Sequence, residues 1–107
     1  MPTTTKPSVT IDDEYRARTR ASAGLYAEAC TVIPAGITHD SRSTLPYPIF
    51  VARAAGPRKW DVDGNEYVDY FGGHGALLLG HSHPAVVEAV QRQVSLGTHW
   101  GASHALE

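Results

Sequence analysis

Residues 60–84 decide the fold, and they read Trp-Asp-Val-Asp-Gly-Asn-Glu-Tyr-Val-Asp-Tyr-Phe-Gly-Gly-His-Gly-Ala-Leu-Leu-Leu-Gly-His-Ser-His-Pro. The run Asp63-Gly64-Asn65 predicts a tight turn, because Gly and Asn adopt positive φ at little cost. Residues that favour β-strands lie on both sides of this turn, so the stretch predicts a β-hairpin. Several glycines between residues 72 and 80 predict a sharply bent loop or a close approach to the backbone. Pro84 then predicts the start of a helix, because proline is favoured at the first helical position.

The flanking sequence extends the hairpin to an α+β segment. We predict a three-stranded antiparallel β-meander with strands at 49–53, 58–62 and 66–71, the first strand ending at the run 54–57. The valines of residues 84–95 recur at helical spacing and predict a helix there. A further helix is predicted to begin at Thr10–Asp13, with a hydroxyl cap and acidic residues in its first turn, and to end near Cys30–Val32.

The two ends of the chain predict an incomplete domain. Residues 1–10 are polar and are expected to form a disordered lead-in. Ser103 is a candidate N-cap for another helix, and residues 103–107 would form only its first turn. We therefore expect residues 11–107 to be the N-terminal segment of a larger domain.

Length, charge and cysteine content limit the function classes. A chain of 107 residues forms one domain at most, and a net charge of −2 gives no basic face for nucleic acid. No apolar run approaches the roughly 20 residues that a membrane helix needs, so we expect no membrane partner. The single cysteine, Cys30, excludes an intramolecular disulfide and favours a reducing compartment, which predicts a cytoplasmic protein.

An irregular segment at residues 34–48 carries the first candidate binding residue. It is rich in Pro, Gly, Ser and Asp, and long irregular segments inside a domain often have a function. Arg42 lies in its middle, between two serines. It is either a solvated surface arginine or an anion clamp, since a guanidinium group binds a carboxylate or phosphate with two parallel hydrogen bonds.

The histidines and the acidic turn leave other readings open. His81 and His83 could supply half of a metal site, but a zinc site needs three or four ligands, so packed or turn-forming histidines are favoured over a metal-dependent hydrolase. The alternation of Asp61, Asp63 and Asn65 resembles the start of a calcium loop, but the glycine comes too early, and a tight turn explains these residues better.

Several short motifs occur together, in order and at a familiar spacing, and the chain thereby resembles a known family. They are Ile33-Pro-Ala-Gly36, Ser41-Arg-Ser43, the run from Trp60 to Tyr70, Leu79-Gly-His-Ser-His-Pro84, Gly97-Thr98 and Ala105-Leu-Glu107. Over residues 31–107 the chain resembles the N-terminal segment of class III (omega-type) aminotransferases, closest to those of the glutamate-1-semialdehyde 2,1-aminomutase type. The resemblance implies part of the small domain of a fold-type I transferase, with pyridoxal 5'-phosphate (PLP) on a lysine and an active site at a homodimer interface.

The resemblance also implies roles for two residues. Arg42 matches an arginine that binds the substrate carboxylate in aminomutase-like proteins. His74 falls where the aminomutase carries an aromatic residue, which implies a different substrate, such as another amino acid or a β-amino acid. Lys6 and Lys59 do not match the family lysine, so this segment alone is expected neither to bind PLP nor to contain catalytic residues. The expected activity of the full-length enzyme is transfer of an amino group between an amino acid and a carbonyl compound, and the alternative is a non-catalytic interaction module or remnant.

Overall fold

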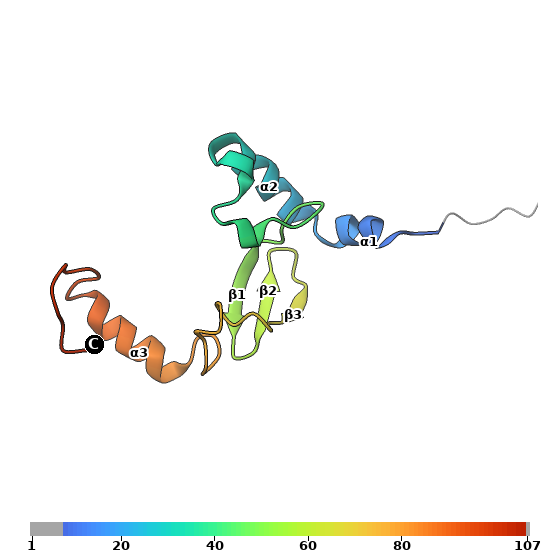
Figure 1. Ribbon diagram of the computed structural model, residues 1–107. Coiled ribbons are helices and arrows are strands. Elements are labelled where there is room, and N and C mark those ends of the chain that lie inside the picture. Colours follow the sequence, from blue (N-terminus) through green and yellow to red (C-terminus); the bar gives the residue numbers. More distant parts are fainter. Residues whose placement is uncertain (1–7, 107) are drawn as a thin grey trace, which may run out of the picture. The chain divides into compact units, whose positions relative to one another are not determined.

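The computed structural model describes residues 8–106 (Figure 1). These residues divide into two compact units. Of the described residues, unit 1 comprises 8–53 and 59–68, and unit 2 comprises 54–58 and 69–106. Of the predicted lead-in, residues 1–7 lie outside the described residues. Within residues 8–106, no helix is both long and apolar enough to cross a membrane.

The order of elements confirms the predicted α+β segment. The helices are α1 (Ile11–Arg18), α2 (Arg20–Val32) and α3 (Pro84–Val94), and the strands are β1 (Val51–Ala55), β2 (Arg58–Asp61) and β3 (Glu66–Val68). The strands form one sheet in the order β1-β2-β3, which is the predicted meander. Two short 3₁₀ turns, η1 (Pro34–Gly36) and η2 (Asp40–Arg42), lie in the segment predicted to be irregular.

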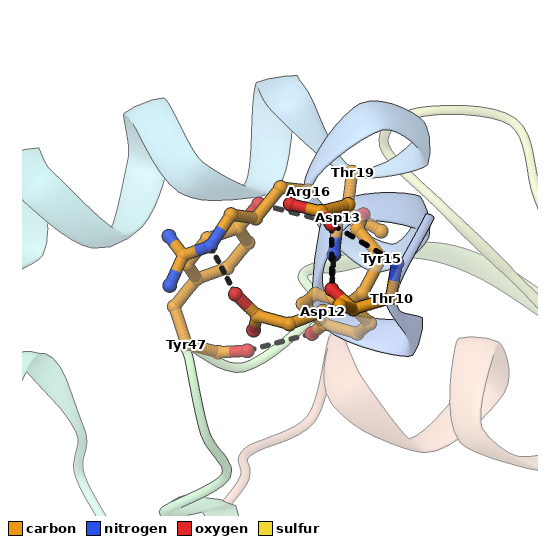
Figure 2. Close-up of polar contacts among 7 residues, drawn as sticks. All are labelled: Thr10, Asp12, Asp13, Tyr15, Arg16, Thr19 and Tyr47. Atoms are coloured by element: carbon orange, nitrogen blue, oxygen red, sulfur yellow. Dashed lines mark hydrogen bonds and ion pairs between the residues drawn. The ribbon is translucent and has the colours of Figure 1, made fainter. Parts of the chain in front are cut away.

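The N-terminal helix begins where predicted but is two helices rather than one. Thr10 caps α1 by accepting a hydrogen bond from the Asp13 amide at 3.1 Å, while the Asp13 carboxylate accepts from the Thr10 amide (Figure 2). The helix stops at Thr19, whose φ of −129° and ψ of 43° are not helical. Thr19 is buried, and its hydroxyl donates to the Tyr15 carbonyl oxygen at 2.6 Å. A threonine hydroxyl that competes for the backbone in this way favours a helix end over a continuous helix.

The tight turn after β2 also caps α2, which is a role the hairpin motif alone does not predict. The Asp63 carboxylate accepts hydrogen bonds from the Ala21 amide at 2.6 Å and from the Ser22 amide at 3.0 Å. The Ser22 hydroxyl donates to the same carboxylate at 2.9 Å. Burial raises the pKa of Asp63, but these hydrogen bonds outweigh burial and leave the pKa below its usual value. The N-cap residue of α2, Thr19, makes no side-chain capping hydrogen bond. Asp63 of the turn therefore provides the acceptor for the first amides of this helix.

A second carboxylate, Asp61, holds the hairpin turn together. It is 3% exposed and accepts hydrogen bonds from the amides of Asp63 and Asn65, from the Asn65 side chain, and from the Tyr67 hydroxyl at 2.8 Å. Burial, followed by the hydrogen bond to Asp61, raises the pKa of Tyr67 to about 12. These contacts account for the acidic alternation as a turn network, as the sequence predicted.

The strand boundaries differ from the prediction at several points. Strand β1 begins at Val51 rather than at residue 49, and β2 ends at Asp61 rather than at residue 62. The first strand continues to Ala55 instead of ending before residue 54, and Gly56 then exchanges two backbone hydrogen bonds with His81, at 2.8 and 2.9 Å. The third strand ends at Val68 rather than at residue 71. Its early end follows from Asp69, whose carboxylate accepts from the Phe71 and Gly72 amides and turns the chain out of the sheet.

The C-terminal elements are confirmed in part. Helix α3 occupies almost the predicted range, with Pro84 in its first turn. Residues 103–106 contain a turn instead of the predicted first turn of a helix, so the candidate cap at Ser103 is wrong for the described residues.

Candidate functional site

The segment of residues 34–48, called here the Arg42 loop, carries the first predicted site residue. Arg42 is the last residue of η2, where its amide donates to the His39 carbonyl oxygen at 3.0 Å. The Ser43 amide donates to the Asp40 carbonyl oxygen at 2.9 Å, and the His39 side chain accepts from the Ser41 amide. Local hydrogen bonds thus give the chain around Arg42 a defined turn in place of the unstructured segment expected from its composition.

The Arg42 side chain is exposed and is held by a neutral group. Its Nη1 donates to the Thr38 hydroxyl at 2.5 Å. Within residues 8–106, Arg42 forms no ion pair with a carboxylate. A guanidinium group has five N–H donors, so this contact leaves donors for an external carboxylate. The geometry fits an anion clamp whose charge is not neutralised by its own turn.

Residues 72–80, called here the glycine loop, carry the second predicted site residue and belong to unit 2. All four glycines of this loop have positive φ, between 51° and 84°, which confirms the predicted sharp bending. His74 itself has a φ of 61°, a conformation uncommon for a residue with a side chain. Its ring meets the Phe71 ring edge-on at a centroid distance of 4.3 Å.

The base of the glycine loop is closed by an acid–histidine pair that the sequence did not predict. His81 Nε2 lies 2.6 Å from Asp69 Oδ2, and only 5% of the Asp69 side chain is exposed. The other oxygen, Asp69 Oδ1, accepts hydrogen bonds from the Phe71 and Gly72 amides at the start of the loop. With the Gly56–His81 bridge, this pair fixes both ends of the loop that carries His74. It also accounts for His81 as a packed histidine, the interpretation favoured from the sequence.

The Arg42 loop and the glycine loop lie in different units, so the two predicted site residues are each placed within their own unit. Arg42 is held on the segment between α2 and β1, and His74 is held on the segment between β3 and α3.

The described residues do not fit a complete PLP or metal site. Lys59 is the single lysine between residues 8 and 106, and it is a half-buried residue of β2. In that same range, no three His, Cys, Asp or Glu side chains come together as metal ligands. The described residues do present an exposed guanidinium group, that of Arg42, and a histidine on a glycine-rich loop, His74.

Comparison with known proteins shows the class to which this chain belongs. Residues 39–105 match the family described as aminotransferase class-III, and the chain belongs to that family. This confirms the resemblance seen in the sequence motifs, and the class III transaminase structures similar to the chain confirm its fold as an N-terminal segment of PLP-dependent aminotransferases.

Particular relatives carry this further. The chain is 45% identical over 87 residues to a glutamate-1-semialdehyde 2,1-aminomutase from Hyperthermus butylicus, which covers 80% of this chain and 20% of that protein. It superposes on a transaminase solved with PLP bound, with a TM-score of 0.75 and 39% identity over 81% of this chain and 20% of the other. A β-phenylalanine aminotransferase from Variovorax paradoxus gives a TM-score of 0.80 and 25% identity over 90% of this chain and 22% of the other. The chain thus spans about a fifth of the length of the relatives it matches.

Proposed function

We propose that this chain works as the N-terminal part of a PLP-dependent aminotransferase of the glutamate-1-semialdehyde aminomutase type. In this role it contributes substrate-binding residues, while the lysine and the phosphate-binding groups come from the remaining four fifths of the family's length. The enzyme moves an amino group between an amino acid and a carbonyl compound. The observation that carries the proposal is Arg42, an arginine without an ion-pair partner in the described part of the chain, in a protein of the class III family.

Arg42 is proposed to bind the carboxylate of the substrate. Two parallel hydrogen bonds from a guanidinium group fix both the position and the orientation of a carboxylate. The hydrogen bond from Nη1 to Thr38 restrains the side chain in advance, which lowers the entropy lost when the substrate binds. A carboxylate held in this way would present the substrate amine to the cofactor in one orientation.

His74 is proposed to influence which substrate is accepted. It stands on a loop in which Gly72 and Gly75 have open space where a side chain would begin, and its ring is smaller than the aromatic residue expected from the aminomutase resemblance. A different side chain at this point favours a substrate other than glutamate-1-semialdehyde. A β-amino acid is one such substrate, and the relative named β-phenylalanine aminotransferase acts on this class.

The proposed enzyme is a cytoplasmic homodimer. The family resemblance supports the dimer, and the free thiol of Cys30 agrees with a reducing compartment. The alternative of an interaction module without catalysis is favoured by the apolar residues exposed on α3 and the glycine loop. Either a second protein or the rest of an enzyme could bury these apolar residues.

Cofactor binding tests the proposal against this alternative. Expression of the complete reading frame that contains these residues should give a protein with the visible absorbance of bound PLP and with transaminase activity. Residues 1–107 alone, mixed with PLP, should retain none after dialysis, because neither Lys6 nor Lys59 matches the family lysine. A reading frame that stops at Glu107, or stoichiometric PLP on one lysine of the isolated chain, would contradict the proposal.

A further inference from the structure

We propose that Tyr26 is a positioning residue for Arg42, because its ring supports both ends of the Arg42 loop. The inference rests on the proposed carboxylate-binding role of Arg42 and concerns how that residue is held in place. Tyr26 lies on α2, outside residues 39–105 that match the family, and neither its sequence neighbourhood nor the family match assigns it a role.

The first end of the loop packs against Tyr26 at Gly36. This glycine is buried and has a φ of 67°. A Cβ atom at this position would lie 2.8 Å from Cε2 of Tyr26 and 2.7 Å from Sγ of Cys30, closer than side chains tolerate. The Gly36 amide donates to the Ile33 carbonyl oxygen at 2.8 Å, so the chain turns directly over the tyrosine ring. Only glycine satisfies both the conformation and the close approach.

The second end of the loop packs against the same ring at Tyr47. Tyr47 is 6% exposed and is the buried hydrophobic residue of the described chain. Its ring stacks on Tyr26 at a centroid distance of 6.4 Å and an interplanar angle of 27°. Tyr15 fixes it from α1, with a centroid distance of 5.3 Å and a hydroxyl that donates to the Tyr47 carbonyl oxygen at 2.6 Å (Figure 2). The Tyr47 and Thr19 hydroxyl groups share a further hydrogen bond of 3.1 Å.

Arg42 lies between these two fixed ends, on a stretch that is itself exposed. Residues 38–45 are all exposed, and the hydrogen bonds around Arg42 stay within residues 38–43. The turn therefore owes its place on unit 1 to Gly36 and Tyr47. Fixing both ends of a loop restricts the conformations available to its middle. Without the Tyr26 ring, Arg42 would have to be ordered when the substrate binds, and affinity for the carboxylate would fall.

Loop mobility in the full 107-residue chain tests this inference without any substrate. The variants are Tyr26→Leu, which removes the ring, and Tyr26→Phe, the matched control that keeps it. The readout is the heteronuclear ¹⁵N nuclear Overhauser effect at the Arg42 and Ser43 amides, with the amides of α2 as the internal reference. For Tyr26→Leu we expect the nuclear Overhauser effect to fall clearly at the Arg42 and Ser43 amides and to stay unchanged in α2. For Tyr26→Phe we expect wild-type values at all of these amides.

A second variant keeps the test decisive if Tyr26→Leu disturbs the helix. Gly36→Ala keeps the Tyr26 side chain but places a Cβ atom against both Tyr26 and Cys30, so it should displace the first end of the loop and mobilise Arg42 in the same way. Unchanged loop values in a folded variant would overturn the inference. Loss of the α2 signals in both variants would also overturn it, because the ring would then support the helix rather than the loop.

Kinetics separates this inference from the proposed function. In the enzyme that contains the segment, Tyr26→Leu should raise KM for an amine that carries a carboxylate by about tenfold, the effect of one weakened charged hydrogen bond, and leave kcat nearly unchanged. The KM for an amine without a carboxylate should stay the same. If Arg42 does not bind the carboxylate, this selective effect disappears while the mobility result stands. If Tyr26 does not position Arg42, the expected rise in mobility at Arg42 and Ser43 is not seen, whatever Arg42 binds.

Discussion

Units 1 and 2 are both built from short segments with few buried apolar side chains, but different kinds of contact hold them together. Unit 1 joins its segments through side chains that contact one another over long sequence distances, as Asp63 does with α2 and Tyr47 does with Tyr15 and Tyr26. Unit 2 is tied by local hydrogen bonds and the Asp69–His81 pair. Both units expose apolar side chains, but those of unit 2 gather along one groove between the glycine loop and α3. The comparison teaches that unit 1 is organised mainly by its own contacts, whereas unit 2 has the surface of a part that is covered by another.

The apolar surface of unit 2 makes the contrast concrete. A groove of about 520 Å³ runs between the glycine loop and α3, lined mainly by leucines and valines. Leu78 is 92% exposed and Val90 is 58% exposed on either side of it. Such a continuous apolar surface is rare on a protein without a partner. It agrees with a chain that spans about a fifth of its relatives.

The largest effect should come from breaking the network of unit 1 at Asp61. Asp61→Ala removes a buried carboxylate that accepts four hydrogen bonds. The expected loss is about 3 kcal/mol in the free energy of unfolding, because several hydrogen bonds to one charged group are lost together. Urea unfolding followed by tryptophan fluorescence measures this loss. As a control, Asp40→Ala removes a carboxylate that is 96% exposed and should change stability little; an equal loss in both would refute the network's role.

A change in the apolar surface should alter association rather than stability. We expect the isolated chain to self-associate through the groove of unit 2, so the double variant Leu78→Lys/Val90→Lys should be monomeric at concentrations where the wild type is not. Leu45→Lys is the matched control, since Leu45 is 97% exposed but lies in unit 1. Sedimentation velocity distinguishes them. A monomeric wild-type chain that unfolds cooperatively on heating would contradict this prediction, because the apolar groove of unit 2 would then be stable without a partner.

The smallest effect should follow from exchanging the side chain on the glycine loop. In the enzyme that contains the segment, His74→Trp should shift substrate preference by several-fold toward aminomutase-type substrates, a size typical of a changed pocket contact. PLP absorbance should be unaffected, because His74 is proposed to contact only the substrate. Steady-state kinetics on a panel of amino acids and β-amino acids provides the measurement. An unchanged ranking of substrates would remove His74 from the site.

Much of the fold follows from local sequence signals. The tight turn at residues 63–65, the cap at Thr10 and the start of α3 at Pro84 are each written in a few adjacent residues, and all three are confirmed. The end of α1 at Thr19 was missed because a threonine in a helical pattern does not reveal that its hydroxyl will turn back on the chain. The extension of β1 to Ala55 depends on a strand partner further along the sequence.

The candidate site divides in the same way. Arg42 is visible in the sequence as an arginine in an irregular segment, whereas the expected role of His74 comes only from the resemblance to the aminomutase-type proteins. The groups that hold them were not visible: Tyr26 and Tyr47 for the Arg42 loop, and Asp69 with His81 for the glycine loop. These contacts join residues far apart in the chain, and no local pattern records them.

The measurement that tests the account most directly is the substrate dependence of Arg42→Lys in the enzyme that contains this segment. Lysine keeps the charge but lacks the planar fork, so it should not replace the arginine. We expect kcat/KM to fall about ten- to a hundredfold for amines with a carboxylate, equivalent to roughly 1.5–3 kcal/mol, and to stay nearly constant for amines without one. Equal losses for both classes of amine would contradict the account, because Arg42 would then support the structure rather than bind the substrate.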